Sequence, residues 1–148
     1  LFISLGLLTL EDEEKPTMNH NNSKKFECQF TAVTINDSPA IMLKNLVGTT
    51  LGIWAAHGEG KFVFPYKESE YYIPAKYHHS SYPANPNGSH YNAAMLTSKD
   101  GRHLVMMPHL ERSTFPWNWA HYPSDQNDEV SPWMLAFESA FSWLASKQ

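Results

Sequence analysis

Met106-Met107-Pro108-His109-Leu110-Glu111-Arg112 is the stretch from which the fold is best inferred. It continues the apolar run Leu104-Val105-Met106-Met107, which follows an Asp100-Gly101 turn and predicts a short buried strand. The sequence therefore places an imidazole and a carboxylate on a loop at the end of a strand. Because one residue separates them, Glu111 can bind one ring nitrogen of His109 and leave the other available. This is the arrangement of the base and its orienting partner in a nucleophilic triad.

The same His-x-Glu pattern has a simpler explanation. Two polar residues at this spacing are common in surface loops, where they pair locally, and on spacing alone that case is the more frequent. The buried strand before the pair favours the functional interpretation. No Cys or Ser in a glycine-rich turn between a strand and a helix precedes the pair. The chain is therefore expected to hold two of the three members of a triad.

The composition indicates one globular domain covering residues 1–148. The chain is 42% hydrophobic and 14% aromatic, which is enough for a core. The formal charge of −4 and the lack of a basic patch argue against nucleic acid as a partner. A single cysteine cannot form an internal disulfide, so we expect a reducing, cytoplasmic location.

Residues 1–10 form an apolar stretch that is too short to span a membrane, which takes ~20 residues. The stretch has no basic leader of the kind that begins a signal peptide, and the acidic run Glu11-Asp12-Glu13-Glu14 follows it. We interpret it as the end of a buried helix. The sequence therefore predicts no membrane partner and a chain that is a piece of a longer protein.

Hydrophobic patterning divides the rest of the chain into strands and two short helical parts. The first strand alternates in a way that predicts an inward-facing Cys28, and the final helix is expected to open at Ser131-Pro132-Trp133 with Ser131 as N-cap. The apolar residues of that helix are predicted to form its buried face. Residues 68–80 are expected to be irregular. The predicted strands are 26–35, 50–56, 61–64, 92–98 and 102–107, with one or two helical turns at 40–46.

Two other groups of residues are candidates for chemistry. The turn His57-Gly58-Glu59-Gly60 follows a predicted buried strand, and its glycines would let the backbone approach a ligand. An ordinary turn with a solvated Glu59 is the more frequent explanation. A metal site is a rival hypothesis because the chain has eight histidines. None of them lies two or four positions from another, as paired zinc ligands do, so no metal is expected.

Three motifs in order resemble one known family. Met107-Pro108-His109-Leu110-Glu111-Arg112, Ala56-His57-Gly58-Glu59-Gly60 and Tyr82-Pro83-Ala84-Asn85-Pro86-Asn87-Gly88-Ser89 are similar to the C-terminal glutaminase domain of the phosphoribosylformylglycinamidine synthases. Asp100-Gly101-Arg102 and the closing Ser131-Pro132-Trp133 extend the resemblance along nearly the whole chain. It implies a class I, triad-type glutamine amidotransferase with an α/β flavodoxin-like sandwich. The piece seen here would lack the N-terminal strands of that sandwich and its nucleophile elbow.

The resemblance also implies roles for individual residues. A Cys would attack the side-chain amide of glutamine, His109 would act as general base and then acid, and Glu111 would orient His109. His57, Gly58 and Glu59 would lie beside the glutamine pocket. The loop at 82–89 would face the synthetase part. No cofactor is implied for this piece, since ATP and magnesium would act in the synthetase domain of the full synthase, where ammonia meets formylglycinamide ribonucleotide.

The chain departs from the family pattern in three places. The Cys elbow of the family would lie just before the segment that matches residues 1–8, Leu110 stands where many members have proline, and the segment before Tyr82 is short. The isolated chain is therefore expected not to hydrolyse glutamine and to need the remainder of the synthase chain, with its elbow, as a partner. The alternative is a degenerate, non-catalytic amidotransferase-like domain kept for binding or assembly.

Overall fold

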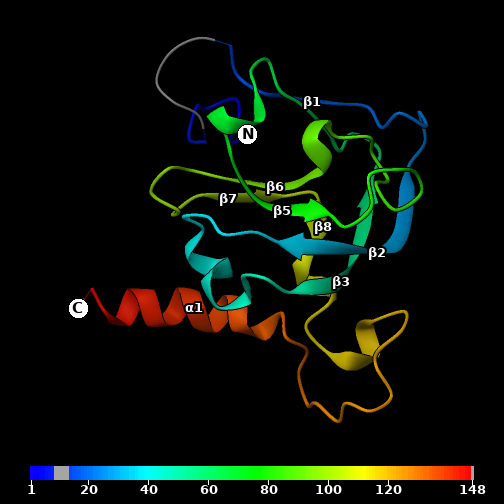
Figure 1. The fold of residues 1–148 in the computed structure, drawn as a ribbon, viewed down its shortest axis with the longest axis vertical. Coiled ribbons are helices and arrows are strands. Elements are labelled where there is room, and N and C mark those ends of the chain that lie inside the picture. Colours follow the sequence, from blue (N-terminus) through cyan, green and yellow to red (C-terminus); the bar gives the residue numbers. More distant parts are fainter. Residues whose placement is uncertain (9–13, 148) are drawn as a thin grey trace.

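A six-stranded sheet forms the centre of the computed structural model, which describes residues 1–8 and 14–147 (Figure 1). Its strand order is β7-β6-β5-β2-β3-β8, and a separate two-stranded sheet pairs β1 with β4. The strands are β1 Thr17–Asn19, β2 Glu27–Ile35, β3 Thr50–His57, β4 Lys61–Val63, β5 Tyr72–Tyr77, β6 Ala93–Thr97, β7 Leu104–Met106 and β8 Pro108–His109. The helix α1 is Met134–Ala145, and the 3-10 turns are η1 Ile41–Leu46, η2 Glu68–Glu70, η3 His90–Asn92, η4 Leu110–Arg112 and η5 Pro116–Asn118.

The register of β3 places the predicted catalytic loop. On one side β3 pairs with β2 along its whole length, from Thr50 to His57. On the other side it pairs with β8 at only two positions, Trp54 with His109 and Ala55 with Pro108. All strand pairs among the described residues are antiparallel, whereas a flavodoxin-like sandwich is built on a parallel sheet. β8 is thus a two-residue strand that fixes the start of the His-Glu loop against β3.

The main core lies where α1 and η1 cover one face of the sheet (Figure 1). Alternate residues of β2 and β3 point into it, as expected for a sheet with one covered face. Trp133 and Ala136 from the start of α1 are fully buried in the same cluster. A second, smaller cluster lies on the side of the N-terminal residues and comprises Ile3, Leu8, Phe62, Phe64, Ile73, Ala93 and Leu96.

Most predicted strands are confirmed, but β5 was missed. The sequence predicts an irregular segment at 68–80, whereas Tyr72–Tyr77 is a strand between β2 and β6. Pro74 lowers the strand propensity of this segment because it has no N–H to donate. The structure accommodates it at an irregularity in the β5–β6 register between Tyr72 and Ala75, while its carbonyl accepts a hydrogen bond from Asn36 N–H.

The sequence predicted the wrong buried face for the first strand of the sequence analysis, which is β2. Thr31, Val33 and Ile35 point into the core, whereas Cys28 is exposed. The alternation of apolar and polar residues does not distinguish the faces here, because both contain apolar side chains. Phe30, on the face predicted to be buried, is only partly buried and contacts the rings of Trp54 and Trp119.

The ends of the chain also differ from expectation. Residues 1–8 form hydrogen-bonded turns rather than a helix, and the rest of that predicted helix lies outside the described residues, as do positions 11–13 of the acidic run. Ser131 Oγ accepts from Trp133 N–H in the turn before α1, which begins at Met134. Much of the predicted buried face of α1 is exposed, namely Leu135, Phe137, Phe141 and Leu144. None of the helices described is long and apolar enough to cross a bilayer.

Two glycines allow a direct test of the β6–β7 turn. Gly101 and Gly48 both have positive φ, 71° and 84°. A Cβ at Gly101 would lie 1.8 Å from the Pro39 carbonyl oxygen, whereas one at Gly48 would meet nothing within 4 Å. We expect Gly48→Ala to cost about 1–2 kcal/mol from backbone strain and Gly101→Ala about 1–3 kcal/mol more from the clash. Urea unfolding of both variants measures the difference, and equal losses would contradict it.

Candidate active site

His109 and Glu111 form the hydrogen-bonded pair that their spacing predicts. His109 ends β8 and Glu111 lies in the 3-10 turn η4, which curls the carboxylate back toward the ring. His109 Nδ1 is 2.7 Å from Glu111 Oε1, so the ring N–H donates to the carboxylate. The side chains are 30% and 64% exposed. The pair is therefore reachable from solvent while its orientation is fixed by a charge-assisted hydrogen bond.

The second nitrogen of His109 lies against β3. Nε2 is 3.4 Å from the Ala56 carbonyl oxygen, which is long for a hydrogen bond. Nε2 is thus held near the sheet edge without a strong partner there. A ring with Nδ1 bound to a carboxylate and Nε2 weakly engaged is suited to accept a proton from an approaching nucleophile.

Side chains, rather than a neighbouring strand, occupy much of the outer edge of β3. Trp133 Nε1–H donates to the Gly52 carbonyl oxygen at 2.8 Å, and Trp54 N–H donates to Ser113 Oγ at 3.4 Å. Ser113 follows η4, and its carbonyl accepts from Trp119 Nε1–H at 2.7 Å and from Ser131 Oγ–H. The edge of β3 is therefore connected to the loop of the His109–Glu111 pair, to the segment that carries Trp119 and to the start of α1.

The turn after β3 separates the three predicted pocket residues. His57 is buried, Gly58 is partly buried and Glu59 is exposed. The Glu59 carboxylate lies 3.5 Å from His20 Nδ1. A Cβ at Gly60 would lie 2.0 Å from the His57 ring, so this position must be glycine for the imidazole to fold under the turn. Of the three, Gly58 and Glu59 reach solvent beside the strand that carries His57.

A buried polar network was not predicted from the sequence. Asn87 is fully buried, and its Nδ2 lies 3.1 Å from His57 Nε2 and 3.0 Å from the Tyr77 hydroxyl. Asn21 Nδ2 donates to the His57 carbonyl at 2.6 Å, and its Oδ1 accepts from Gly60 N–H at 3.1 Å. Loop residues rich in Asn, Pro and Gly are normally assigned to the surface. The resemblance of the 82–89 segment was the only signal that could have singled out Asn87.

Burial lowers the pKa of His57 below its ordinary value of 6.5, and the charge of nearby His109 lowers it further. The backbone of Met107 and the carboxylate of Glu27, which lies opposite His57 in β2, oppose this effect. The net result is a histidine that stays neutral in the folded protein at a pH where a free histidine would be charged.

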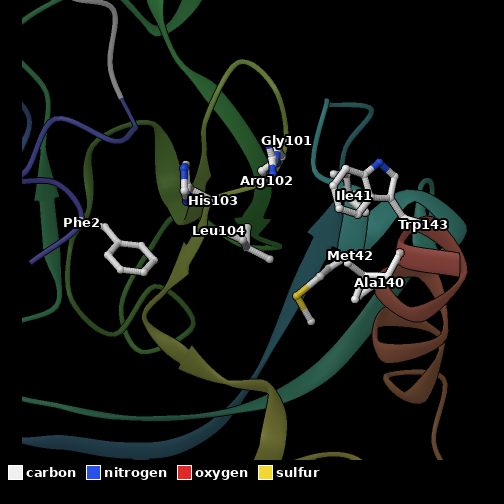
Figure 2. Close-up of a pocket in the computed structure, with 10 residues that line it drawn as sticks. Phe2, Ile41, Met42, Gly101, Arg102, His103, Leu104, Ala140 and Trp143 are labelled. Carbon is white, nitrogen blue, oxygen red and sulfur yellow. The ribbon is translucent and has the colours of Figure 1, made fainter. Parts of the chain in front are cut away.

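A pocket of about 560 Å³ lies elsewhere, between η1, the β6–β7 turn and α1 (Figure 2). Figure 2 shows Phe2 on one side of it and Trp143 on the other, with Arg102 and His103 between them. None of its lining residues belongs to the His109–Glu111 pair or to the turn after β3. Over residues 1–8 and 14–147, no group of three or more His, Cys, Asp or Glu side chains is placed to hold a metal ion.

The lowered pKa of His57 predicts a pH-dependent stability. As the pH falls through 6.5, the unfolded chain binds a proton at His57 and the folded chain does not, so the free energy of unfolding decreases. His57→Gln removes this contribution. Urea unfolding at about pH 5.5 and pH 7.5, on either side of the usual histidine range, should show a smaller loss in the variant. An identical pH dependence in both proteins would contradict the assignment.

Comparison with known proteins identifies the family of this chain. Residues 1–144 match the CobB/CobQ-like glutamine amidotransferase domain family. The probable phosphoribosylformylglycinamidine synthase of Arabidopsis thaliana, named as chloroplastic/mitochondrial, is 44% identical over 91% of this chain and 11% of its own length. The human phosphoribosylformylglycinamidine synthase is 37% identical over 85% of this chain and 10% of its own length.

The fold likewise has a solved counterpart. The structure of PurLQS from Thermotoga maritima superposes with a TM-score of 0.71 at 23% identity, covering 97% of this chain and 57% of that one. This similarity confirms the predicted α/β amidotransferase-type fold. The chain spans only about a tenth of the two synthases above. It belongs to the CobB/CobQ-like glutamine amidotransferase domain family, in the form that occurs in phosphoribosylformylglycinamidine synthases.

Proposed function

We propose that this chain is the His-Glu part of the glutaminase domain of a phosphoribosylformylglycinamidine synthase. Such an enzyme uses ammonia from glutamine, with ATP and magnesium in a separate synthetase domain, to convert formylglycinamide ribonucleotide to the amidine in purine biosynthesis. The observation that carries the proposal is the 2.7 Å contact between His109 Nδ1 and Glu111 Oε1, with Nε2 of the same ring only weakly engaged.

His109 would first accept a proton from the thiol and then donate it to the leaving group. As the Cys sulfur attacks the amide carbon of glutamine, Nε2 takes the thiol proton, and it then gives that proton to the departing ammonia. A thioester forms as the C–N bond breaks, and water activated by the same ring releases glutamate. Glu111 keeps the imidazole oriented and stabilises its positive charge, which develops at each transfer.

Cys28 does not fit the role of nucleophile. Cys28 lies on β2 and pairs with Ala56 of β3. His109 lies on β8 and pairs with Trp54 on the other side of β3. The strand β3 separates the backbones that carry the two residues, by about 9–10 Å for two strand spacings. Cys28 also lies within a strand, not in a tight turn at the start of a helix, where catalytic thiols are activated. The nucleophile would therefore come from the remainder of the synthase, and the isolated chain is expected to be inactive on glutamine. The cytoplasmic location expected from the lone cysteine stays a prediction.

Gly58 and Glu59 are proposed to border the glutamine pocket. Both lie in the exposed turn that follows Ala56, whose carbonyl faces His109. Glutamine carries an ammonium and a carboxylate beside its amide, and the exposed carboxylate of Glu59 would bind the ammonium. His57, which is buried, would act from beneath this turn rather than touch the substrate.

The test uses a synthase polypeptide that includes this chain. His109→Ala is expected to lower glutamine hydrolysis by a factor on the order of 10⁴ or more, as when a triad member is removed. Ammonia-dependent synthesis should persist, because it bypasses the glutaminase step. Glu111→Gln should lower glutamine hydrolysis as well, since the amide holds the ring without the charge.

Glu138→Gln is the matched control, because it makes the same change on the exposed side of α1. It should leave both activities unchanged. Glutamine hydrolysis that survives His109→Ala would contradict the proposal and favour the non-catalytic binding or assembly domain. The 148-residue chain assayed alone should release no ammonia from glutamine.

A further inference from the structure

The imidazole of His57 is a buried group that the mechanism above does not use. Its ring is 8% exposed and lies at the carboxyl end of β3. Nε2 is 3.1 Å from Asn87 Nδ2. Nδ1 is buried and makes no hydrogen bond of ordinary geometry in the part of the chain that the structure describes, although the Met107 backbone interacts with the ring. A buried polar atom without such a bond is rare and costly enough to need a physical explanation.

The neighbours of Asn87 determine which way its amide points. Ser89 N–H lies 3.0 Å from Asn87 Oδ1, and a backbone N–H can only donate, so Oδ1 is the acceptor. Ser89 Oγ–H donates to the same oxygen at 2.7 Å. The Asn87 Nδ2 group must therefore use its two hydrogens on the Tyr77 hydroxyl and on His57 Nε2.

This orientation fixes the tautomer of His57. Because Asn87 donates to Nε2, that nitrogen is an acceptor and the single ring proton lies on Nδ1. A charged His57 would need a hydrogen on Nε2, directed at the hydrogens of the Asn87 amide. The Tyr77 hydroxyl offers no charge to balance it, since burial raises the pKa of Tyr77. The network thus accepts only a neutral ring.

His57 lies next to the site through the backbone of β3. The residue before it, Ala56, presents the carbonyl oxygen that faces His109 Nε2. Charged or polar groups that act on His57 from other elements are His109 from β8, Glu27 from β2 and the Met107 backbone. A positive charge on His57 would repel the charge that His109 must take up in each proton transfer.

We propose that His57 is a positioning residue for His109. Asn87 holds His57 as a neutral imidazole with its proton on Nδ1, so that of the two histidines only His109 takes up the proton. The inference rests on the proposed function for its catalytic meaning, but the tautomer itself does not. It also assigns a role to Asn87, which is fully buried.

The first experiment records ring nitrogen–proton correlation spectra of the uniformly ¹⁵N-labelled 148-residue chain between about pH 5 and pH 8, the range in which a free histidine titrates. His57 is expected to show a protonated Nδ1 and an unprotonated Nε2 in the upper half of this range, and to stay so at lower pH than a free histidine does. A His57 that carries its proton on Nε2, or on both nitrogens in the upper half of this range, would overturn the proposal. This measurement requires no variant.

The second experiment replaces the Asn87 amide, which donates to His57 Nε2, by an acceptor. Asn87→Asp is nearly isosteric, keeps an acceptor for Ser89 and places a carboxylate opposite His57 Nε2. Loss of the unprotonated Nε2 signal of His57 is expected at pH values where the parent chain retains it, together with a shift of the His109 ring signals. Asn85→Asp is the control, because it adds the same charge to the same loop without a contact to His57. It should change neither ring.

A double variant separates the charge on His57 from the new carboxylate. In His57→Gln/Asn87→Asp the side chain at position 57 can still bond to position 87 but cannot ionise, so the His109 signals should return to their parent positions. His109 signals that do not respond to Asn87→Asp would overturn the positioning role. None of these readouts depends on glutamine hydrolysis, so a failure here is distinguishable from a failure of the proposed function.

Discussion

The hydrogen bond from Trp133 Nε1–H to the Gly52 carbonyl oxygen is the constraint on which the rest of the site depends. It joins residues 81 positions apart, at the outer edge of β3, where the neighbouring strand β8 is only two residues long. A strand edge left bare would expose unpaired backbone groups. Here the indole of Trp133 and the hydroxyl of Ser113 occupy that edge, so its backbone is satisfied by side chains.

This arrangement explains how a short loop holds the His109–Glu111 pair in place. Trp133 is fully buried at the start of α1, and the adjoining Ser131 binds the Ser113 carbonyl. Ser113 follows directly on the 3-10 turn that carries Glu111. The His-Glu pair is thus braced from both ends, by β8 pairing and by the contacts of Ser113. A site held within a fraction of an ångström by packed neighbours is what proton transfer requires.

The local features of the site were predictable from sequence, and the long-range ones were not. The His109–Glu111 bond follows from spacing and from the preceding apolar run, both of which are local. β5 was missed because Pro74 lowers strand propensity, and only the register irregularity beside β6 shows how it fits. Cys28 was placed on the wrong face because β2 has apolar side chains on both. The burial of Asn87 depends on a loop folding over His57 and Tyr77, which no pattern along the chain reports.

The free energy of unfolding of Trp133→Phe, compared with Trp143→Phe, tests this account most directly. Both changes keep an aromatic ring and remove an indole N–H. Trp133→Phe leaves the Gly52 carbonyl without its donor and should cost about 1–3 kcal/mol. Trp143 is partly buried beside Arg102 and Lys147, and its substitution keeps an aromatic ring there, so it should cost less than Trp133→Phe. Equal effects of the two substitutions would mean that the edge of β3 does not depend on Trp133.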